Sequence, residues 1–119
     1  MKKIYISGQI TGLSHDEYTD NFGRAEALLL DQEYFPVNPL KVKACVDEDC
    51  GTGETKPNGE YLHSWECYLK YDIIDMLDCD GILMLPNWRL SKGSQFEMDI
   101  AAKCGLTVLY LDDYYRDWS

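Results

Sequence analysis

Glu97 is the acidic residue whose place in the sequence points most directly to chemistry. The apolar run that ends at Pro86 is followed by a polar turn rich in Gly and Ser, and a helix with Glu97 near its start comes next. In α/β folds, ligands bind at such a junction between the carboxyl end of a strand and the next helix. The chain also begins with this arrangement, because the strand-like residues 3–6 run directly into the polar loop 7–12. The pair of junctions predicts one pocket for a small molecule.

The elements that must position these junctions alternate between strand and helix. Strands are predicted at 3–7, 34–37, 81–85 and 106–111, and helices at 17–32, from about 64 onward, and at 94–103. Ser14 or Asp16 is a suitable N-cap for the first helix. Pro36 indicates an edge strand or a strand end, and Gly105 is a natural helix stop. The order predicts an α/β protein with a three-layer Rossmann-like or flavodoxin-like fold, in which a parallel sheet of roughly four to five strands lies between helices.

The length of 119 residues suits one domain, residues 1–119, with one hydrophobic core. Residues 41–60 interrupt the pattern, since glycines and a proline break the periodicity and acidic residues outnumber lysines. This stretch is predicted to be an irregular acidic surface loop that could cover the pocket.

Charge and composition exclude several classes of partner. The formal net charge of −10 argues against nucleic acid and against anionic membrane surfaces. No apolar run approaches the roughly 18 to 20 residues that cross a bilayer, and no export signal is recognisable. The five cysteines, an odd number, are then most simply the reduced thiols of a cytoplasmic protein. Of these, Cys79 and Cys104 are predicted to be small core residues.

Several segments together resemble the nucleoside 2-deoxyribosyltransferase superfamily, which includes the 2′-deoxynucleoside 5′-monophosphate N-glycosidases. They are IYISGQITG at 4–12, YDIIDMLDCD at 71–80 and LPNWRLSKGSQFEMDIA at 85–101. The sequence is most similar to a small bacterial and phage branch of that superfamily. The resemblance extends over nearly the whole chain, with 41–60 the least matched part, and implies a single domain of this type.

The resemblance implies roles for individual residues. Tyr5 matches a first-strand tyrosine that helps to position the nucleophile, Asp72 an aspartate that handles the proton of the leaving base, and Glu97 the nucleophile. Ser91 stands where transferases tend to carry a sugar-binding aspartate and where the nucleotide-hydrolysing relatives carry a serine that binds the 5′-phosphate. Gly93 matches the glycine of the same turn. The serine therefore favours a nucleoside monophosphate as substrate.

A pair of carboxyl groups can cleave an N-glycosidic bond without a metal or redox cofactor, so no cofactor is expected. One carboxylate, Glu97, would capture C1′ as a glycosyl-enzyme intermediate. The other, Asp72, would protonate the leaving base if burial raises its pKa. The turn 91–94 would offer N–H and hydroxyl donors to a phosphate. The predicted substrate-binding residues are Ser7, Gly8, Gln9, Ile10, Trp88, Ser91, Gly93 and Ser94.

Simpler interpretations of these residues stay open. Glu97 could belong to a capping box with Ser94. Asp72 could be a solvated charge like Asp75 or Asp78 on the same helix. The fold could also serve as a non-catalytic module that binds or senses a nucleotide. Structural roles, in core packing or helix capping, are the alternatives for Tyr5, Trp88 and Ser91.

A second constellation has ligand types that suit a structural zinc ion. Its spacing of C-x4-C, then H-x3-C, is not that of a common zinc finger, so free thiols are the default interpretation. A zinc-stapled interaction protein is the alternative. The residues concerned are Cys45, Cys50, His63 and Cys67.

The expected partner of the pocket is a small-molecule nucleoside or nucleotide. The resemblance also implies a homodimer or a higher homo-oligomer, because relatives complete their sites with residues of a neighbouring subunit. Aromatic residues are enriched at interfaces, so the C-terminal tail could supply this contact or could pack on its own domain. Its aromatic residues are Tyr110, Tyr114, Tyr115 and Trp118.

Overall fold

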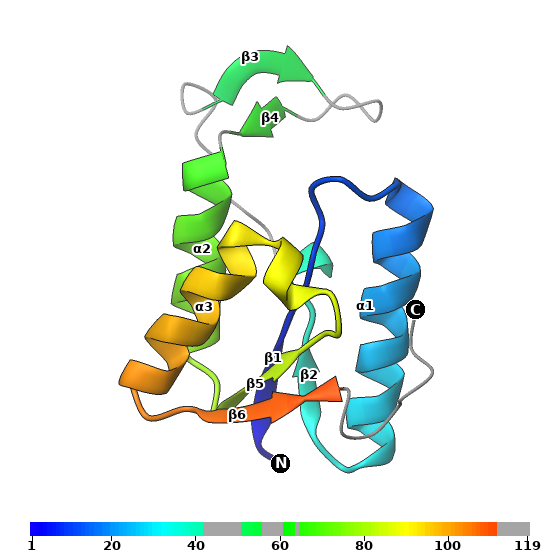
Figure 1. The fold of residues 1–119 in the computed structure, drawn as a ribbon, viewed down its shortest axis with the longest axis vertical. Helices are drawn as coiled ribbons and strands as arrows, with labels where there is room; N and C mark the ends of the chain where they lie inside the picture. Colours follow the sequence, from blue (N-terminus) through cyan, green and yellow to red (C-terminus); the bar gives the residue numbers. More distant parts are fainter. Residues whose placement is uncertain (42–50, 56–60, 64, 112–119) are drawn as a thin grey trace.

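The computed structural model describes residues 1–41, 51–55, 61–63 and 65–111 of the chain. Its centre is a four-stranded parallel sheet with the strand order β2-β1-β5-β6 (Figure 1). The parallel sheet confirms the predicted fold class. The strands are β1 (Lys3–Ser7), β2 (Phe35–Val37), β5 (Gly81–Met84) and β6 (Thr107–Tyr110).

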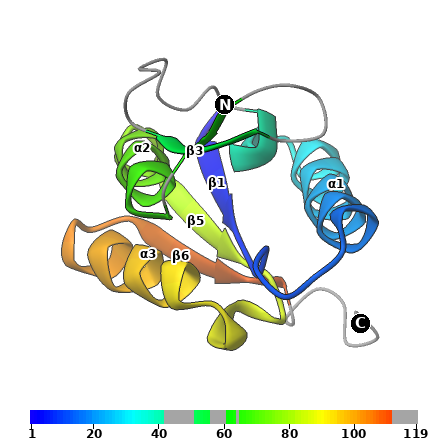
Figure 2. The ribbon, with the colours of Figure 1, turned by 90° about the horizontal axis from the view of Figure 1, so that it is seen from above.

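Helices cover both faces of the sheet, which gives the predicted three layers. Helix α1 (His15–Asp31) lies on one face, and α2 (Trp65–Leu77) and α3 (Lys92–Lys103) lie on the other (Figure 2). Short 3-10 turns, Pro39–Lys41 and Trp88–Leu90, follow β2 and β5. Within the described residues, none of these helices combines the length and the apolar character that crossing a bilayer requires.

Side-chain alternation along β1 divides the core between the two faces of the sheet. Ile4 and Ile6 belong to the apolar cluster on the α1 side, and Tyr5 belongs to the cluster on the side of α2 and α3. Because successive side chains of a strand point to opposite faces, Ser7 lies on the same face as Tyr5. Both hydroxyl groups are therefore turned toward α3, the helix that carries Glu97.

Short-range sequence signals account for the element boundaries. The side chain of Ser14 caps α1 by accepting a hydrogen bond from the backbone N–H of Glu17 at 3.2 Å. Gly105 follows the end of α3 with a φ of 80°, a conformation that favours glycine. Pro36 lies in β2, the edge strand, where the missing N–H costs no ladder hydrogen bond on the open side.

The prediction of an irregular loop at 41–60 is wrong for residues 51–55, which form a strand. Strand β3 (Gly51–Thr55) pairs with β4 (Tyr61–His63) in an antiparallel arrangement. The sequence GTGET has no apolar alternation, so the usual strand signal was missing, although backbone pairing needs no apolar side chain. The rest of the predicted loop, 42–50 and 56–60, lies outside the described residues.

The prediction that Cys104 is a core residue is also wrong. Cys104 is the C-cap of α3 and is exposed, whereas Cys79 is buried as expected. The difference arises because a residue at the end of a helix leaves the buried face as the chain turns back toward the sheet.

The central strands β1 and β5 define where a ligand can bind. From β1 the chain passes through α1 to β2 on one side, and from β5 it passes through α3 to β6 on the other. The connections diverge, and a crevice opens at the carboxyl ends of the two strands. Ser7 and Met84 are paired at this end of the sheet. The loops that follow them carry most of the predicted site residues.

Gly8 is required where the loop after β1 passes over β5. A Cβ atom at this position would lie 2.5 Å from Cδ1 of Leu85. We expect Gly8→Ala to lower the free energy of unfolding by about 1–3 kcal/mol, because the added methyl group must displace a buried leucine. Urea denaturation of the variant and the wild type measures the difference.

Gly23 provides the matched control. It is an exposed residue of α1 where an added Cβ has nothing within 4 Å. Gly23→Ala should raise the free energy of unfolding by roughly 0.5–1 kcal/mol. Unchanged stability in Gly8→Ala would contradict the close approach to Leu85.

Candidate active site

Glu97 lies in the second turn of α3 and points toward the sheet, with 6% of its surface exposed. The Tyr5 hydroxyl donates a hydrogen bond to Oε2 at 2.6 Å, and Oγ of Ser7 donates one to Oε1 at 2.8 Å. Each carboxylate oxygen thus has its own donor from β1. Burial raises the pKa of Glu97 to about 7, against the opposing effect of these hydrogen bonds.

Asp72 provides a second carboxyl group in the same region. It lies on α2, which packs against α3 and β1, and it is partly buried. Burial, followed by repulsion from Glu97 and Asp75, raises the pKa of Asp72 to about 7. Asp78, by contrast, is exposed and pairs with Lys3 at 3.1 Å. Asp72 therefore lies within electrostatic reach of Glu97, whereas Asp78 is engaged with Lys3.

Tyr5 completes this group as a permanent donor. Its side chain is fully buried. Burial raises the pKa of Tyr5 well above its ordinary value, and the nearby charges of Glu97 and Asp72 raise it further. The hydroxyl therefore keeps its proton at neutral pH. The predicted residues come from three different elements. Tyr5 and Glu97 are joined by a hydrogen bond, and Asp72 lies within electrostatic reach of both.

The loop after β1 has a more structural role than its sequence predicted. The backbone N–H of Gln9 donates to Oδ1 of Asn87 at 3.1 Å, which ties this loop to the one after β5. The side-chain amide of Gln9 donates to the carbonyl oxygen of Thr11 at 3.0 Å. Ile10 packs against the core on the α1 side. Sequence reasoning missed Asn87, because an asparagine after a proline is common in any turn.

Trp88 belongs to the core rather than to an open stacking surface. Its side chain is 8% exposed, and its ring lies 6.2 Å from that of Tyr110, between centroids. The Arg89 guanidinium lies over the ring, 4.6 Å from its centroid. Within the described residues, the indole Nε1 has no hydrogen-bond partner. Little of the ring is left for the predicted contact with a base.

Of the aromatic tail, Tyr110 packs on its own domain, and its hydroxyl donates to Sδ of Met98 at 3.6 Å. The proposed contact with a neighbouring subunit stays a prediction, since the other aromatic residues lie outside the described part of the chain. They are Tyr114, Tyr115 and Trp118.

The first turn of α3 contains the residues predicted to hold a phosphate. Ser91 is the N-cap, and its Oγ accepts a hydrogen bond from the backbone N–H of Ser94 at 3.2 Å. Ser91 is the N-cap, and Glu97 accepts hydrogen bonds from residues of β1. The interpretation of Ser94 and Glu97 as a capping box is therefore wrong. The Ser94 side chain is 1% exposed, and its Oγ has no partner among the described residues. A Cβ at Gly93 would meet only Oγ of Ser91, at 3.8 Å.

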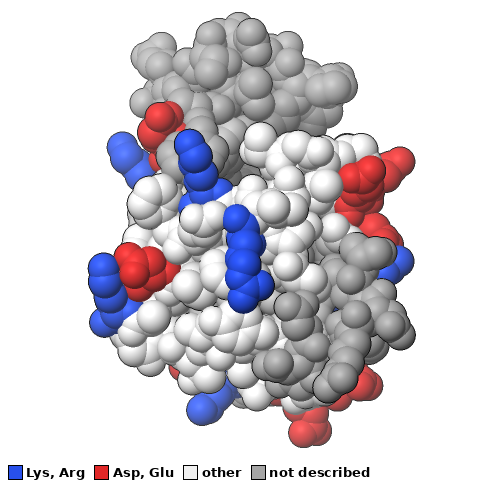
Figure 3. Space-filling view, in the orientation of Figure 1, with Lys and Arg blue, Asp and Glu red and all other residues white. Residues whose placement is uncertain are grey.

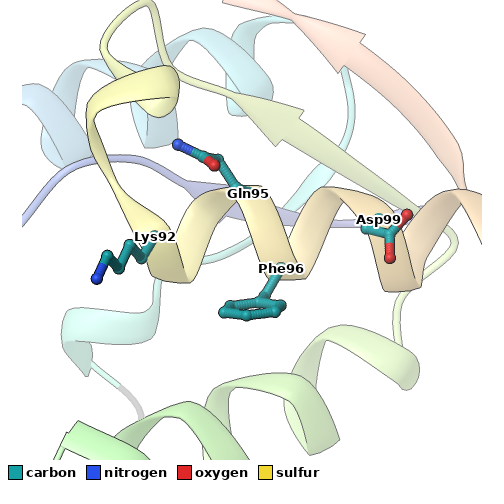
Figure 4. A pocket seen from close by; sticks show the side chains of 4 residues that line it. All are labelled: Lys92, Gln95, Phe96 and Asp99. Atoms are coloured by element: carbon teal, nitrogen blue, oxygen red, sulfur yellow. The ribbon is translucent and has the colours of Figure 1, made fainter.

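A separate depression lies on the outer side of α3, with a volume of about 590 Å³ (Figure 4). At about 100° per residue, most of its lining is on the opposite side of the helix from Glu97. It is therefore not the carboxylate site. The lining residues described are Lys92, Gln95, Phe96 and Asp99.

The zinc prediction remains a prediction. Among the residues that the structure describes, no group of three or more His, Cys, Asp or Glu side chains could hold a metal ion. Of the predicted ligands, Cys67 is buried on α2. Cys45, Cys50 and the side chain of His63 lie outside the described part of the chain.

Comparison with known proteins gives a family and a fold. The family described as "Domain of unknown function (DUF4406)" matches residues 2–110. No curated protein matches the sequence at a significant level.

Solved structures similar to this one include 2-deoxyribosyltransferases. The enzyme from Leishmania mexicana is 20% identical with a TM-score of 0.60, over 98% of this chain and 72% of its own. The enzyme from Bacillus psychrosaccharolyticus is 18% identical with a TM-score of 0.57, over 91% and 70%. A conserved protein from Enterococcus faecalis V583 is 18% identical with a TM-score of 0.59, over 92% of this chain but only 62% of its own length. These identities establish the shared fold alone.

The buried carboxyl group of Glu97 should make stability depend on pH. With its pKa raised to about 7 from 4.5, the folded protein keeps a proton that the unfolded chain has already lost. The stability that this proton provides is complete below about pH 4.5 and is lost as the pH rises through 7. We expect Glu97→Gln to gain stability relative to wild type between pH 5 and 8, by on the order of 2–3 kcal/mol.

Urea denaturation across this pH range measures the difference, with Asp99→Asn as the control. Asp99 lies on the same helix but is exposed and pairs with Lys103. A difference between Glu97→Gln and wild type that does not change with pH would show that the carboxyl group titrates normally.

Proposed function

The chain belongs to the DUF4406 family and has the fold of 2-deoxyribosyltransferases, and on this basis we propose that it cleaves or transfers the N-glycosidic bond of a 2′-deoxynucleoside or its 5′-monophosphate. One observation carries the proposal. Glu97 is a buried carboxylate held at both oxygens by Tyr5 and Ser7, and the carboxyl group of Asp72 lies within its electrostatic reach. A pair of carboxyl groups, one acting as a general acid with a raised pKa and the other as a nucleophile, is typical of glycosidic bond cleavage.

In the first step, an oxygen of Glu97 bonds to C1′ of the sugar as the bond from C1′ to the base nitrogen breaks. The electron pair of the broken bond goes to the base, and Asp72 donates the proton that neutralises it. A pKa of about 7 leaves Asp72 partly protonated at neutral pH, as a general acid must be. The 2′-deoxy sugar favours this step, since it lacks a hydroxyl group that would withdraw electrons from C1′.

In the second step, water or a second nucleobase attacks C1′, and the bond between C1′ and Glu97 breaks. The electron pair returns to Glu97 as a carboxylate, and the proton of the attacking group goes to Asp72. Both residues are then ready for another cycle. Attack by water makes the protein a hydrolase, and attack by a base makes it a transferase.

The 5′-phosphate of a nucleotide would bind at the first turn of α3. The backbone N–H groups of a helix start favour an anion, and the unpartnered Ser94 hydroxyl is a buried donor in the same turn. Although the net charge is −10, some basic side chains lie in the middle of the face that includes α3, while other basic side chains and most acidic ones lie toward its edges (Figure 3). These features favour a nucleoside monophosphate as substrate.

Replacement of either carboxyl group should remove activity. We expect Glu97→Gln to slow release of free base from deoxynucleotides roughly 10³-fold or more, because the nucleophile is lost. Asp72→Asn should slow release about 10²- to 10⁴-fold, and less for an N7-methylated purine, whose base leaves without added protonation. Chromatography of the free base measures each rate, and Asp99→Asn serves as the control.

The same proteins and substrates also test the alternative function, a module that binds a nucleotide without catalysis. If no deoxynucleoside or monophosphate loses its base, but a nucleotide raises the melting temperature of wild type and Glu97→Gln equally, the protein binds nucleotides without catalysis.

Ser94 should distinguish nucleotides from nucleosides. We expect Ser94→Ala to raise KM for a deoxynucleoside monophosphate about 10-fold, since one hydrogen bond to a charged phosphate is lost. KM for the corresponding deoxynucleoside should stay the same. Steady-state kinetics with both substrates provides the test, and equal effects on the two substrates would argue against a phosphate at this turn.

A further inference from the structure

The Ser7 hydroxyl is as closely engaged with Glu97 as the Tyr5 hydroxyl is. Ser7 is 1% exposed, and its Oγ lies 2.8 Å from Oε1 of Glu97. A serine that binds substrate needs a hydroxyl group that is not already committed to another partner. The Ser7 proton is instead directed to the Glu97 carboxylate, whereas the Ser94 hydroxyl has no partner among the described residues. Its contact therefore indicates a role that differs from the predicted one in substrate binding.

Resting on the proposed function, we propose that Ser7 is a positioning residue that acts through Glu97. Its hydroxyl holds Oε1 in the ionised carboxylate while Tyr5 holds Oε2, and together they fix the orientation of the nucleophile. With Tyr5 alone, the second oxygen would be buried without a donor, which is a costly arrangement for a charged group. Two donors from one strand, on positions that share a face, solve this for both oxygens at once.

The charges around Glu97 make the neutral donors necessary. From β1 the Tyr5 hydroxyl donates a hydrogen bond to it. From α2 the carboxyl group of Asp72 lies within electrostatic reach, and the pKa of Asp72 is raised first by burial and then by Glu97 and Asp75. Within the described residues, Tyr5 and Ser7 are the groups that lower the pKa of Glu97. The ionised form of Glu97 therefore depends on the two hydroxyl donors. Among the described residues, no cationic side chain contributes to lowering its pKa.

The same donor would assist the second step of the reaction. When the bond between C1′ and Glu97 breaks, its electron pair returns to the carboxylate. A hydroxyl group held 2.8 Å from Oε1 stabilises the returning charge, because hydrogen bonds to ionised acceptors are stronger than those to neutral esters. Ser7 would thus stabilise the ionised Glu97 carboxylate before it attacks C1′ and again when the bond between C1′ and Glu97 breaks.

Titration of Glu97 in Ser7→Ala tests the proposal without any substrate. Carbon-13 NMR of protein labelled at the glutamate carboxyl carbon follows the group, and Glu97→Gln assigns its signal. We expect the titration midpoint in Ser7→Ala to rise by about one pH unit, since a hydrogen bond to the charged form is lost. Ser7→Cys, with a weaker donor of similar size, should give a smaller rise and serves if Ser7→Ala does not fold. An unchanged midpoint in the folded variant would overturn the proposal.

Ser14→Ala is the matched control. It loses a serine hydrogen bond, the cap of α1, and some stability, but should leave the Glu97 midpoint unchanged. In the active protein, the rate of Ser7→Ala relative to wild type should rise about 10-fold between pH 6 and pH 8.5, as Glu97 becomes ionised in both proteins. A smaller deficit should remain above pH 8.5, because the variant still lacks the donor that orients the carboxylate and stabilises its returning charge. A purely structural defect would not recover with pH. Absence of turnover in wild type would count against the proposed function, whereas the titration would still decide the role of Ser7.

Discussion

A buried carboxylate with two hydroxyl donors is the interaction on which the rest of this structure depends. An ionised group without partners cannot be buried at tolerable cost, so Glu97 requires both Tyr5 and Ser7. Those donors share one face of β1, and Glu97 must therefore occupy the turn of α3 that lies over that strand. This contact fixes the helical phase of α3 relative to β1.

Much of the fold could be predicted because its signals are local. Ser14 before α1 and Gly105 after α3 act within one turn of the chain, and the apolar run of β5 identifies a strand covered on both faces. The hairpin of β3 and β4 was missed for a related reason. It is held by pairing between two segments, and neither segment carries the alternating apolar pattern that would announce it.

The site was less accessible to sequence reasoning, because its contacts join distant residues. Glu97 could be recognised from its junction, and Asp72 only from the resemblance. The contact between Ser7 and Glu97 depends on the phase of a helix relative to a strand, which the sequence does not show. The sequence did show that Tyr5 and Ser7, two residues apart in a strand, point to the same face of the sheet. Trp88 and Ile10 show the opposite limit, since an apolar side chain beside a site can equally well belong to the core.

The free-energy cost of burying Glu97 favours a catalytic role for this residue over a purely structural one. A neutral side chain of similar shape could fill the same space without the desolvation that raises the pKa of Glu97 to about 7. The fold keeps an ionisable group there and places a second one, Asp72, where the two repel each other. Such an arrangement lowers stability at neutral pH, and apolar packing on both faces of the sheet must offset it. Strained electrostatics of this kind are common at catalytic sites, and a purely structural role would leave the cost unexplained.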